Sequence, residues 1–213
     1  RIEKRTRGEA EMIIEDAMLA ANDAVARFLR NTGSTAIYRI HDRPDPDKLT
    51  SLRHMLAAIG KTVDLPDEPR PSDIQKLLTD TKGTEVGSVI EMMTLRSLPQ
   101  ACYRTENIGH FGIASDCYTH FTSPIRRYPD LIVHRLIRQA LFMHPEKSFL
   151  GRQQSFLEQA SLQCSEREQA SVEAERDVND LKITEYMIPY VGESFDAHVT
   201  GTTRFGIFVG LDN

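Results

Sequence analysis

The sequence lacks any long apolar run. Its longest apolar stretches, such as 131–133, fall far short of the roughly 20 residues that a membrane-spanning helix needs. No apolar segment near the start resembles a signal peptide. These absences argue against a membrane span and a secretory leader, so we expect a soluble, cytoplasmic protein with no membrane partner.

Cysteine is scarce, and so is excess positive charge. The three cysteines, Cys102, Cys117 and Cys164, are odd in number and widely spaced, which argues against a disulfide framework and a four-thiolate zinc site. The 26 Lys and Arg against 31 Asp and Glu give a net charge of −5. Since no global positive field attracts a polyanion, any contact with nucleic acid must depend on a few placed residues.

The sequence does contain enough apolar residues, 40%, to bury the core of one large or two small globular domains. Short apolar runs predict strands over 35–40 and 109–119. Helical spacing, capping residues and prolines predict helices over 1–30, 46–59, 72–78, 85–98, from Pro129 onward, and over 165–188. We therefore expect an α+β fold that is mainly helical.

The pattern changes near the end of the chain. Apolar residues alternate within 195–199 and again within 205–209, which predicts two antiparallel strands. A two-stranded ribbon is marginal in water, so we expect these strands to open a barrel whose other strands are missing. Because the chain starts at Arg1 without a methionine and stops at Asn213, we expect an excised piece of a longer parent. Its exposed strand edges predict self-association.

The densest cluster of chemically active side chains lies in the run 119–135, THFTSPIRRYPDLIVHR. It places Arg126, Arg127 and Tyr128 between two prolines that restrict the backbone. Arginine offers a planar fork of donors to two phosphate oxygens and keeps its charge, so this pattern points to phosphate recognition. The alternative is a helix entrance at which the arginines are solvated or paired with acids.

The longer run GHFGIASDCYTHFTSPIRRYPDLIVHR closely resembles the signature of the RNB family of exoribonucleases, the ribonuclease II and ribonuclease R family. The resemblance extends to IIEDAMLAANDAVA, AIYRIHDRPDPDKL and SEREQASVEAERDV, and thus to nearly the whole chain. The combination of GHFG with TSPIRRYPDL favours the ribonuclease R branch. The resemblance implies the C-terminal part of an RNB catalytic domain over 1–190 and the first strands of an incomplete OB-type RNA-binding barrel over 191–213.

The family implies a processive hydrolase that shortens single-stranded RNA from its 3′ end to 5′-mononucleotides, with Mg²⁺ in the intact parent. By position, Arg126 matches the catalytic arginine that stabilises the scissile phosphate, and Glu175 matches a glutamate near the terminal nucleotide. A guanidinium aimed at the phosphoryl oxygens lowers the barrier by up to a few kcal/mol. The alternative for Glu175 is a solvated position on a helix rich in Glu and Arg.

The remaining expected RNA contacts are Arg127, Tyr128, Glu15, Asn22, Phe205 and Phe208. Glu15 matches a family residue that meets the RNA, and Asn22, seven residues later on the same helical face, is placed to orient it. The two phenylalanines either stack on RNA bases or belong to the core of a sheet, and the pattern leaves both open. For His134 a structural imidazole is favoured over a catalytic base.

The Asp-rich loop from which the family draws its metal ligands lies upstream of the matched region and is absent from this sequence. Two-metal phosphoryl chemistry needs several carboxylates converging on ions about 4 Å apart. The nearest imitation, Asp42, Asp45 and Asp47, is interrupted by two prolines and uses Asp45 as a helix cap. We therefore expect no metal site and no hydrolysis from this chain by itself. The alternative is a non-catalytic RNA-binding or assembly module on an RNB scaffold.

Overall fold

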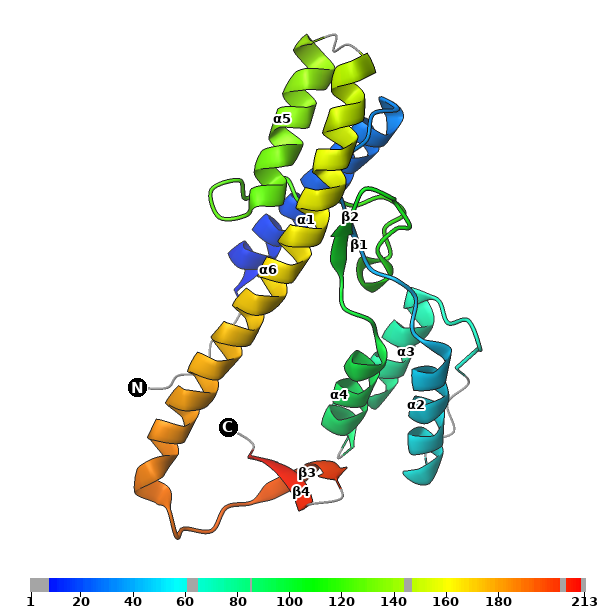
Figure 1. Ribbon diagram of the computed structural model, residues 1–213. Coiled ribbons are helices and arrows are strands. Elements are labelled where there is room, and N and C mark those ends of the chain that lie inside the picture. Colours follow the sequence, from blue (N-terminus) through cyan, green and yellow to red (C-terminus); the bar gives the residue numbers. More distant parts are fainter. Residues whose placement is uncertain (1–7, 61–64, 85, 144–146, 204–205, 212–213) are drawn as a thin grey trace. The chain divides into compact units, whose positions relative to one another are not determined.

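The structure is a computed structural model that describes residues 8–60, 65–84, 86–143, 147–203 and 206–211. Two compact units are present, one of residues 9–166 and one of residues 1–8 with 167–213. Helices dominate, which confirms the mainly helical α+β fold. The elements, shown in Figure 1, are in chain order α1 (Glu9–Asn31), β1 (Tyr38–Ile40), α2 (Pro46–Ala58), α3 (Pro71–Thr81), α4 (Gly87–Ser97), β2 (Cys102–Arg104), η1 (Phe111–Ile113), α5 (Tyr128–Phe142), α6 (Lys147–Met187), η2 (Ile188–Tyr190), β3 (Ala197–Thr203) and β4 (Gly206–Leu211).

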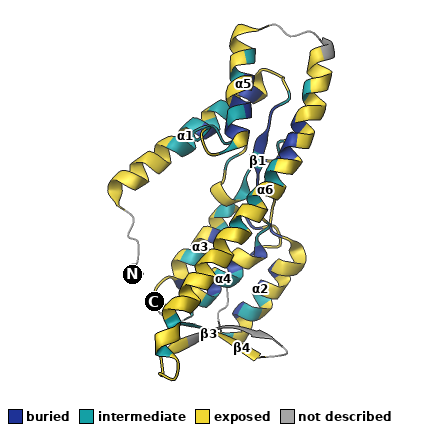
Figure 2. Cartoon of the chain, turned by 60° about the vertical axis from the view of Figure 1, so that its left-hand side comes forward, coloured by how far each residue is buried: buried dark blue, intermediate teal, exposed yellow. Residues whose placement is uncertain are grey.

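The first core of the unit 9–166 lies among α1, β1, α5 and the first half of α6. Its most deeply buried side chains include Leu29, Ile37, Val133 and Leu157, each at most 1% exposed. Figure 2 shows buried residues on β1 and on neighbouring parts of α1 and α5. Each such side chain stabilises the fold by about 1.5–3 kcal/mol. Strand β1 pairs antiparallel with β2, and this core supports the chain segment that leads into α5.

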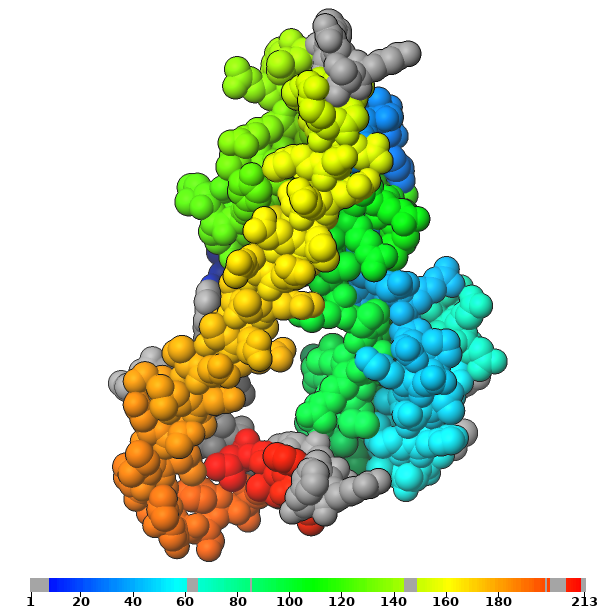
Figure 3. Space-filling view, in the orientation of Figure 1, coloured from blue at the N-terminus to red at the C-terminus, as the bar shows by residue number. Residues whose placement is uncertain are grey.

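A second core joins α2, α3 and α4, which lie together in Figure 1. Figure 3 shows α2, in light blue, covering one side of this three-helix cluster. The Asp45 side chain accepts hydrogen bonds from the Asp47 amide at 2.8 Å and from the Lys48 amide at 3.3 Å, and Pro46 follows it at the first helical position. The predicted start of α2 is therefore confirmed. No helix within the described ranges is long and apolar enough to cross a membrane.

The predicted strand over 109–119 is wrong. Phe111–Ile113 form the short helix η1, and Ala114 after it adopts a left-handed conformation with φ 54°. The His110 amide donates to the Ser115 carbonyl at 2.8 Å, and the Ser115 amide donates to the His110 carbonyl at 3.3 Å. These paired bonds close a tight loop that an alternating apolar pattern does not reveal.

The predicted start of the last long helix at Ser165 is also wrong, because α6 begins at Lys147. Within the helix, the Ser165 hydroxyl accepts a hydrogen bond from the Tyr103 amide at 2.9 Å and donates to the Ser161 carbonyl at 2.9 Å. The hydroxyl of this capping-like motif thus contacts β2 and the preceding helical turn. A capping motif is recognised from residues close together in sequence, whereas the partner of the Ser165 hydroxyl on β2 is far away in sequence.

The second unit contains the predicted pair of terminal strands. Strands β3 and β4 are antiparallel, with Val199 opposite Val209, and the register shifts between Val199 and Gly201. Such an irregularity increases the local twist of a hairpin. The expectation of two antiparallel strands is confirmed.

Candidate functional site

The arginine loop, residues 121–127, precedes α5 and is held first by α1. Asn22 on α1 is only 3% exposed, and its Oδ1 accepts hydrogen bonds from the Phe121 amide at 2.9 Å and from the Thr122 amide at 3.3 Å. Its Nδ2 donates to the Tyr118 hydroxyl at 2.9 Å. Asn22 therefore holds the start of the loop through Oδ1 and the segment just before it through Nδ2.

The second anchor of the arginine loop is a buried ion pair. Asp130, in the first turn of α5, is 0% exposed, and its Oδ1 accepts from the Ser123 amide at 2.7 Å and from Arg127 Nη2 at 2.8 Å. A carboxylate in the first turn also interacts favourably with the positive end of the helix dipole. Asp130 thus fixes both the loop backbone and the Arg127 side chain.

The third anchor is His134, one turn further along α5. Its Nε2 lies 3.0 Å from the Phe121 carbonyl oxygen, which requires the proton to be on Nε2. The two rings also stack, with their centroids 4.3 Å apart and their planes inclined by 15°. This imidazole has a structural partner on the loop, as the sequence analysis favours.

The two adjacent arginines of the loop face different surroundings. The Arg127 side chain is 20% exposed and paired with Asp130, whereas Arg126 is exposed and makes no salt bridge with any residue the structure describes. The backbone of Arg126 is nevertheless fixed, because its amide donates to the Ser123 carbonyl at 3.3 Å. Tyr128 beside it is 49% exposed. The loop therefore presents one guanidinium outward on an ordered backbone, an arrangement suited to binding phosphate.

A partly buried histidine, His120, directly precedes the loop. His120 Nδ1 lies 2.7 Å from the Tyr103 hydroxyl, within hydrogen-bonding distance. Burial, followed by the charges of Arg127 and Arg39, lowers the pKa of His120 to about 3. The ring is therefore neutral at physiological pH and adds no charge beside Arg127.

Replacing His120 with glutamine is expected to make the stability of the chain less sensitive to acid. The folded-state pKa of about 3 lies below the ordinary 6.5, so protonation favours the unfolded chain. The contribution of the neutral His120 ring to the free energy of unfolding is complete above pH ~6.5. It is lost as the pH falls toward 3, at up to about 1.4 kcal/mol per pH unit. Urea unfolding should show the wild type losing about 1 kcal/mol more than His120→Gln between pH 7.0 and 5.5. Equal losses would contradict this role of burial.

The other expected site residues are placed as follows. Glu15 is exposed on α1, seven residues before Asn22. Glu175 on α6 and Phe208 on β4, which is 61% exposed, belong to the second unit. Phe205 lies outside the described residues. The geometry of the candidate site therefore rests on the unit 9–166.

Sequence reasoning overlooked Asp130 as an anchor of the arginine loop. The available signal was its spacing of three residues from Arg127 within the first turn of a predicted helix. That spacing is equally compatible with a solvated surface pair. Only the burial of Asp130 distinguishes the two cases.

The described residues do not fit the magnesium that the family resemblance implies. No group of three or more His, Cys, Asp or Glu side chains within them is arranged to hold a metal ion. In the segment with the nearest imitation, Asp45 caps α2, and Asp42 Oδ1 accepts from the Arg43 amide at 2.8 Å. No chemical step is therefore assigned to a metal bound by these residues.

Comparisons with known proteins agree with one another. A family model described as RNB domain matches residues 1–143. Ribonuclease R of Thermotoga maritima is 41% identical over 211 residues, which cover 97% of this chain and 29% of that protein. Mycoplasma genitalium RNase R, solved in complex with ribose-methylated single-stranded RNA, matches with a TM-score of 0.91 and 32% identity over 98% of this chain and 33% of that chain. Its complex with double-stranded RNA matches with a TM-score of 0.90 and 32% identity, over 98% of this chain and 37% of that chain. The chain thus spans less than two fifths of the length of each of these proteins.

Proposed function

The chain belongs to the RNB family. We propose that it carries the part of the active site of a hydrolytic 3′–5′ exoribonuclease that binds the phosphate of the RNA. The observation that carries the proposal is the arginine loop, in which Arg126 faces outward while Arg127 is paired with the buried Asp130. The proposed substrate is single-stranded RNA, released as 5′-mononucleotides. The RNA complexes of Mycoplasma genitalium RNase R support RNA as the ligand.

In the proposed mechanism, Arg126 donates to the non-bridging oxygens of the phosphate that is cleaved. Negative charge gathers on these oxygens as the phosphoryl group is transferred, so a guanidinium aimed at them stabilises the transition state more than the ground state. The loop is held by Asn22, Asp130 and His134 before RNA arrives. The backbone of the loop therefore needs little reordering at the moment of reaction.

Asn22 and Arg127 receive a positioning role in this proposal. Both were expected to contact RNA, yet Asn22 Oδ1 accepts from two amides of the loop and Arg127 Nη2 donates to Asp130. Tyr128, half-exposed beside Arg126, remains a proposed RNA contact. So do three residues on other elements: Glu15, Glu175 and Phe208.

We assign residues 1–190 to the C-terminal part of the catalytic domain and residues 191–213 to the first strands of an OB-type barrel. The antiparallel hairpin of β3 and β4 supports the second assignment. Phe208 and Val209 on β4 are 61% and 60% exposed. An exposed apolar strand in a two-stranded sheet favours pairing with a further chain, so self-association remains part of the proposal.

The chain by itself is expected to bind single-stranded RNA without hydrolysing it. The physical reason is that its described residues provide no cluster of metal ligands and its sequence lacks the family's Asp-rich loop. Fluorescence anisotropy with a labelled 12-nucleotide uridine strand measures binding, and a denaturing gel in the presence of Mg²⁺ measures cleavage. Release of mononucleotides by the purified chain would contradict the expectation.

A chimera tests the enzymatic part of the proposal. In it, these residues replace the matched segment of Thermotoga maritima ribonuclease R, to which they are 41% identical. Stepwise shortening of the RNA from its 3′ end is expected, with the unaltered host enzyme as the positive control. A folded chimera that binds RNA but does not cleave it would favour the alternative, a non-catalytic RNA-binding or assembly module.

A further inference from the structure

A second arginine-lined site lies outside the arginine loop, in the unit 9–166. A cavity of about 620 Å³ opens between the turn after β1, the start of α3, and the end of β2 with the loop that follows it. Each of these segments contributes one arginine to its lining, namely Arg43, Arg70 and Arg104. Small-molecule sites in proteins usually measure about 300–1,000 Å³, so the cavity has room for a nucleotide.

Two of the three guanidinium groups make ion pairs, and both pairs are weak. Arg43 pairs with Glu68 at 3.1 Å, but the two side chains are 73% and 83% exposed, so the pair contributes little stability. Asp73 Oδ2 accepts a hydrogen bond from the Arg70 backbone amide at 2.8 Å, whereas the Nε of the Arg70 side chain lies 3.5 Å from the same oxygen. That backbone bond is the main cause of the lowered pKa of Asp73. Arg104 is exposed and makes no salt bridge with the rest of the described chain.

The two carboxylates that line the cavity have partners of their own. Asp116 is paired with Arg27 and, at 3.1 Å, with Arg30, both on α1. Asp42 accepts a hydrogen bond from the Arg43 backbone amide at 2.8 Å. Glu68 and Asp73 each pair with one of the arginines, and together with Asp42 they match the three arginines in charge. The lining therefore suits a phosphate through its exposed guanidinium donors rather than through a net positive charge.

Another part of the lining is a stack of flat rings. The His41 ring lies 5.2 Å from that of His110 and 6.2 Å from that of Phe111, with planes inclined by 21° and 20°. The backbone holds this stack, because the Phe111 amide donates to the His41 carbonyl at 2.9 Å and the His41 amide donates to the Gly109 carbonyl at 3.1 Å. Burial, followed by the charge of His41, lowers the pKa of His110 to about 4, so this ring is neutral at pH 7.

We propose that this cavity is a second RNA-binding site, in which a base of single-stranded RNA packs on Phe111 and His41 while neighbouring phosphates meet Arg43, Arg70 and Arg104. Aromatic rings beside basic side chains are the combination by which proteins bind single strands. The residues of this site are different from those of the arginine loop. Its ligand rests on the proposed function, because RNA is the polyanion that this function brings to the chain.

Replacing the three lining arginines by glutamine tests the site on the chain as it exists. For Arg43→Gln/Arg70→Gln/Arg104→Gln, binding of the 12-nucleotide uridine strand is expected to weaken about tenfold at 0.1 M salt. Each lost phosphate contact removes about 0.7 from the slope of log affinity against log salt, so the slope should fall in magnitude by about 2. Unchanged affinity and slope in a folded triple variant would overturn the site.

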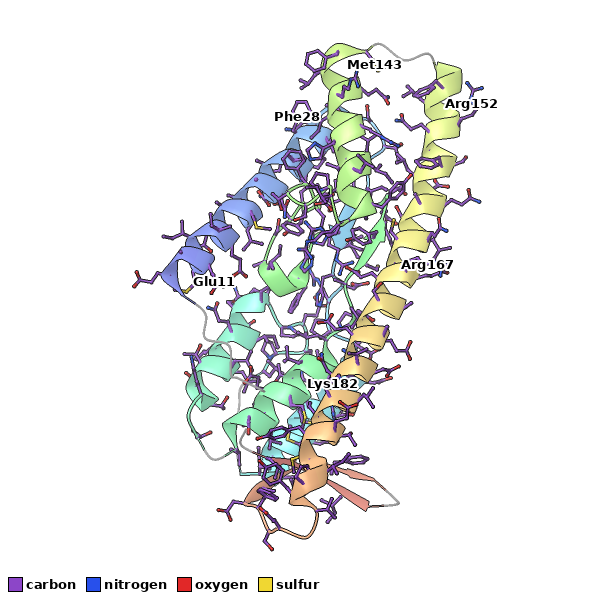
Figure 4. The ribbon with its side chains drawn as sticks, turned by 90° about the vertical axis from the view of Figure 1, so that its left-hand side faces the viewer. Glu11, Phe28, Met143, Arg152, Arg167 and Lys182 are labelled. Atoms are coloured by element: carbon purple, nitrogen blue, oxygen red, sulfur yellow. The ribbon has the colours of Figure 1, made fainter. Side chains whose placement is uncertain are left out.

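The matched control removes the same charge elsewhere. Arg96, Arg138 and Arg152 are exposed on α4, α5 and α6 and do not line the cavity. Figure 4 shows Arg152 projecting from the outer side of α6. Glutamine at these three positions is expected to change the slope by less than about 0.7, the value of one phosphate contact. A loss equal to that of the lining variant would show a general charge effect and overturn the site.

Photo-crosslinking separates the cavity from the arginine loop. A uridine strand that carries 5-iodouridine reacts with rings that pack on its base, and mass spectrometry locates the product. Crosslinks on Phe111 or His41 are expected, and crosslinks confined to Tyr128 would overturn the second site while leaving the proposed function standing. Crosslinks on Phe111 with none at Tyr128 would support the cavity and count against the proposed function.

Discussion

Replacing Asp130 with alanine is expected to lower the free energy of unfolding of the chain by about 3 kcal/mol. The carboxylate is fully buried and holds the Ser123 amide and the Arg127 guanidinium, so alanine leaves both donors without this partner. Removing one side of a buried ion pair costs about 3–5 kcal/mol, and the 20% exposure of Arg127 favours the lower end. Urea unfolding followed by circular dichroism at pH 7 measures the difference.

The matched control for Asp130 is an acid in an exposed ion pair. Glu68 pairs with Arg43 at 3.1 Å, and its side chain is 83% exposed. Because solvent screens such pairs, Glu68→Ala is expected to change stability by no more than about 0.5 kcal/mol. A loss below about 1 kcal/mol for Asp130→Ala would contradict its role as the anchor of the arginine loop.

Features of the fold that depend on neighbours in sequence could be predicted. Asp45 and Pro46 start α2 as expected because the cap bonds join residues two and three positions apart. The predicted strand over 109–119 failed although the bonds between His110 and Ser115 are local, because an alternating apolar pattern does not distinguish such a tight loop from a strand. The Ser165 motif failed because its hydroxyl bonds to Tyr103, which lies 62 positions away. Partners so distant in sequence leave no periodic trace in it.

The candidate site likewise has parts that the sequence predicts and parts that depend on distant residues. Resemblance to a family motif directs attention to Arg126, but the sequence does not reveal which of two adjacent arginines faces solvent. That choice depends on the burial of Asp130, which results from the packing of α5 on the rest of its unit. The role of Asn22 likewise depends on the Phe121 amide, 99 positions further along the chain.

In the chimera with Thermotoga maritima ribonuclease R, Arg126→Ala is expected to reduce the rate of mononucleotide release by about 10²–10³-fold. This loss corresponds to removing one preorganised donor from the charge that develops in the transition state, about 2.7–4 kcal/mol. The affinity for RNA should change by less than about threefold, because many other contacts bind the strand in the ground state. Arg138→Ala, an exposed arginine on α5, is the control and should leave both quantities unchanged.

If the arginine loop acts on the phosphate in the transition state, Arg126→Ala must slow cleavage without weakening the binding of RNA. Single-turnover cleavage rates and dissociation constants are determined for the unaltered chimera and for Arg126→Ala on the same single-stranded RNA. We expect the rate to fall by at least about 100-fold while the dissociation constant stays within about threefold. A rate that is unchanged at saturating RNA, with a dissociation constant raised about 100-fold, would show that Arg126 merely holds RNA and would contradict the claim.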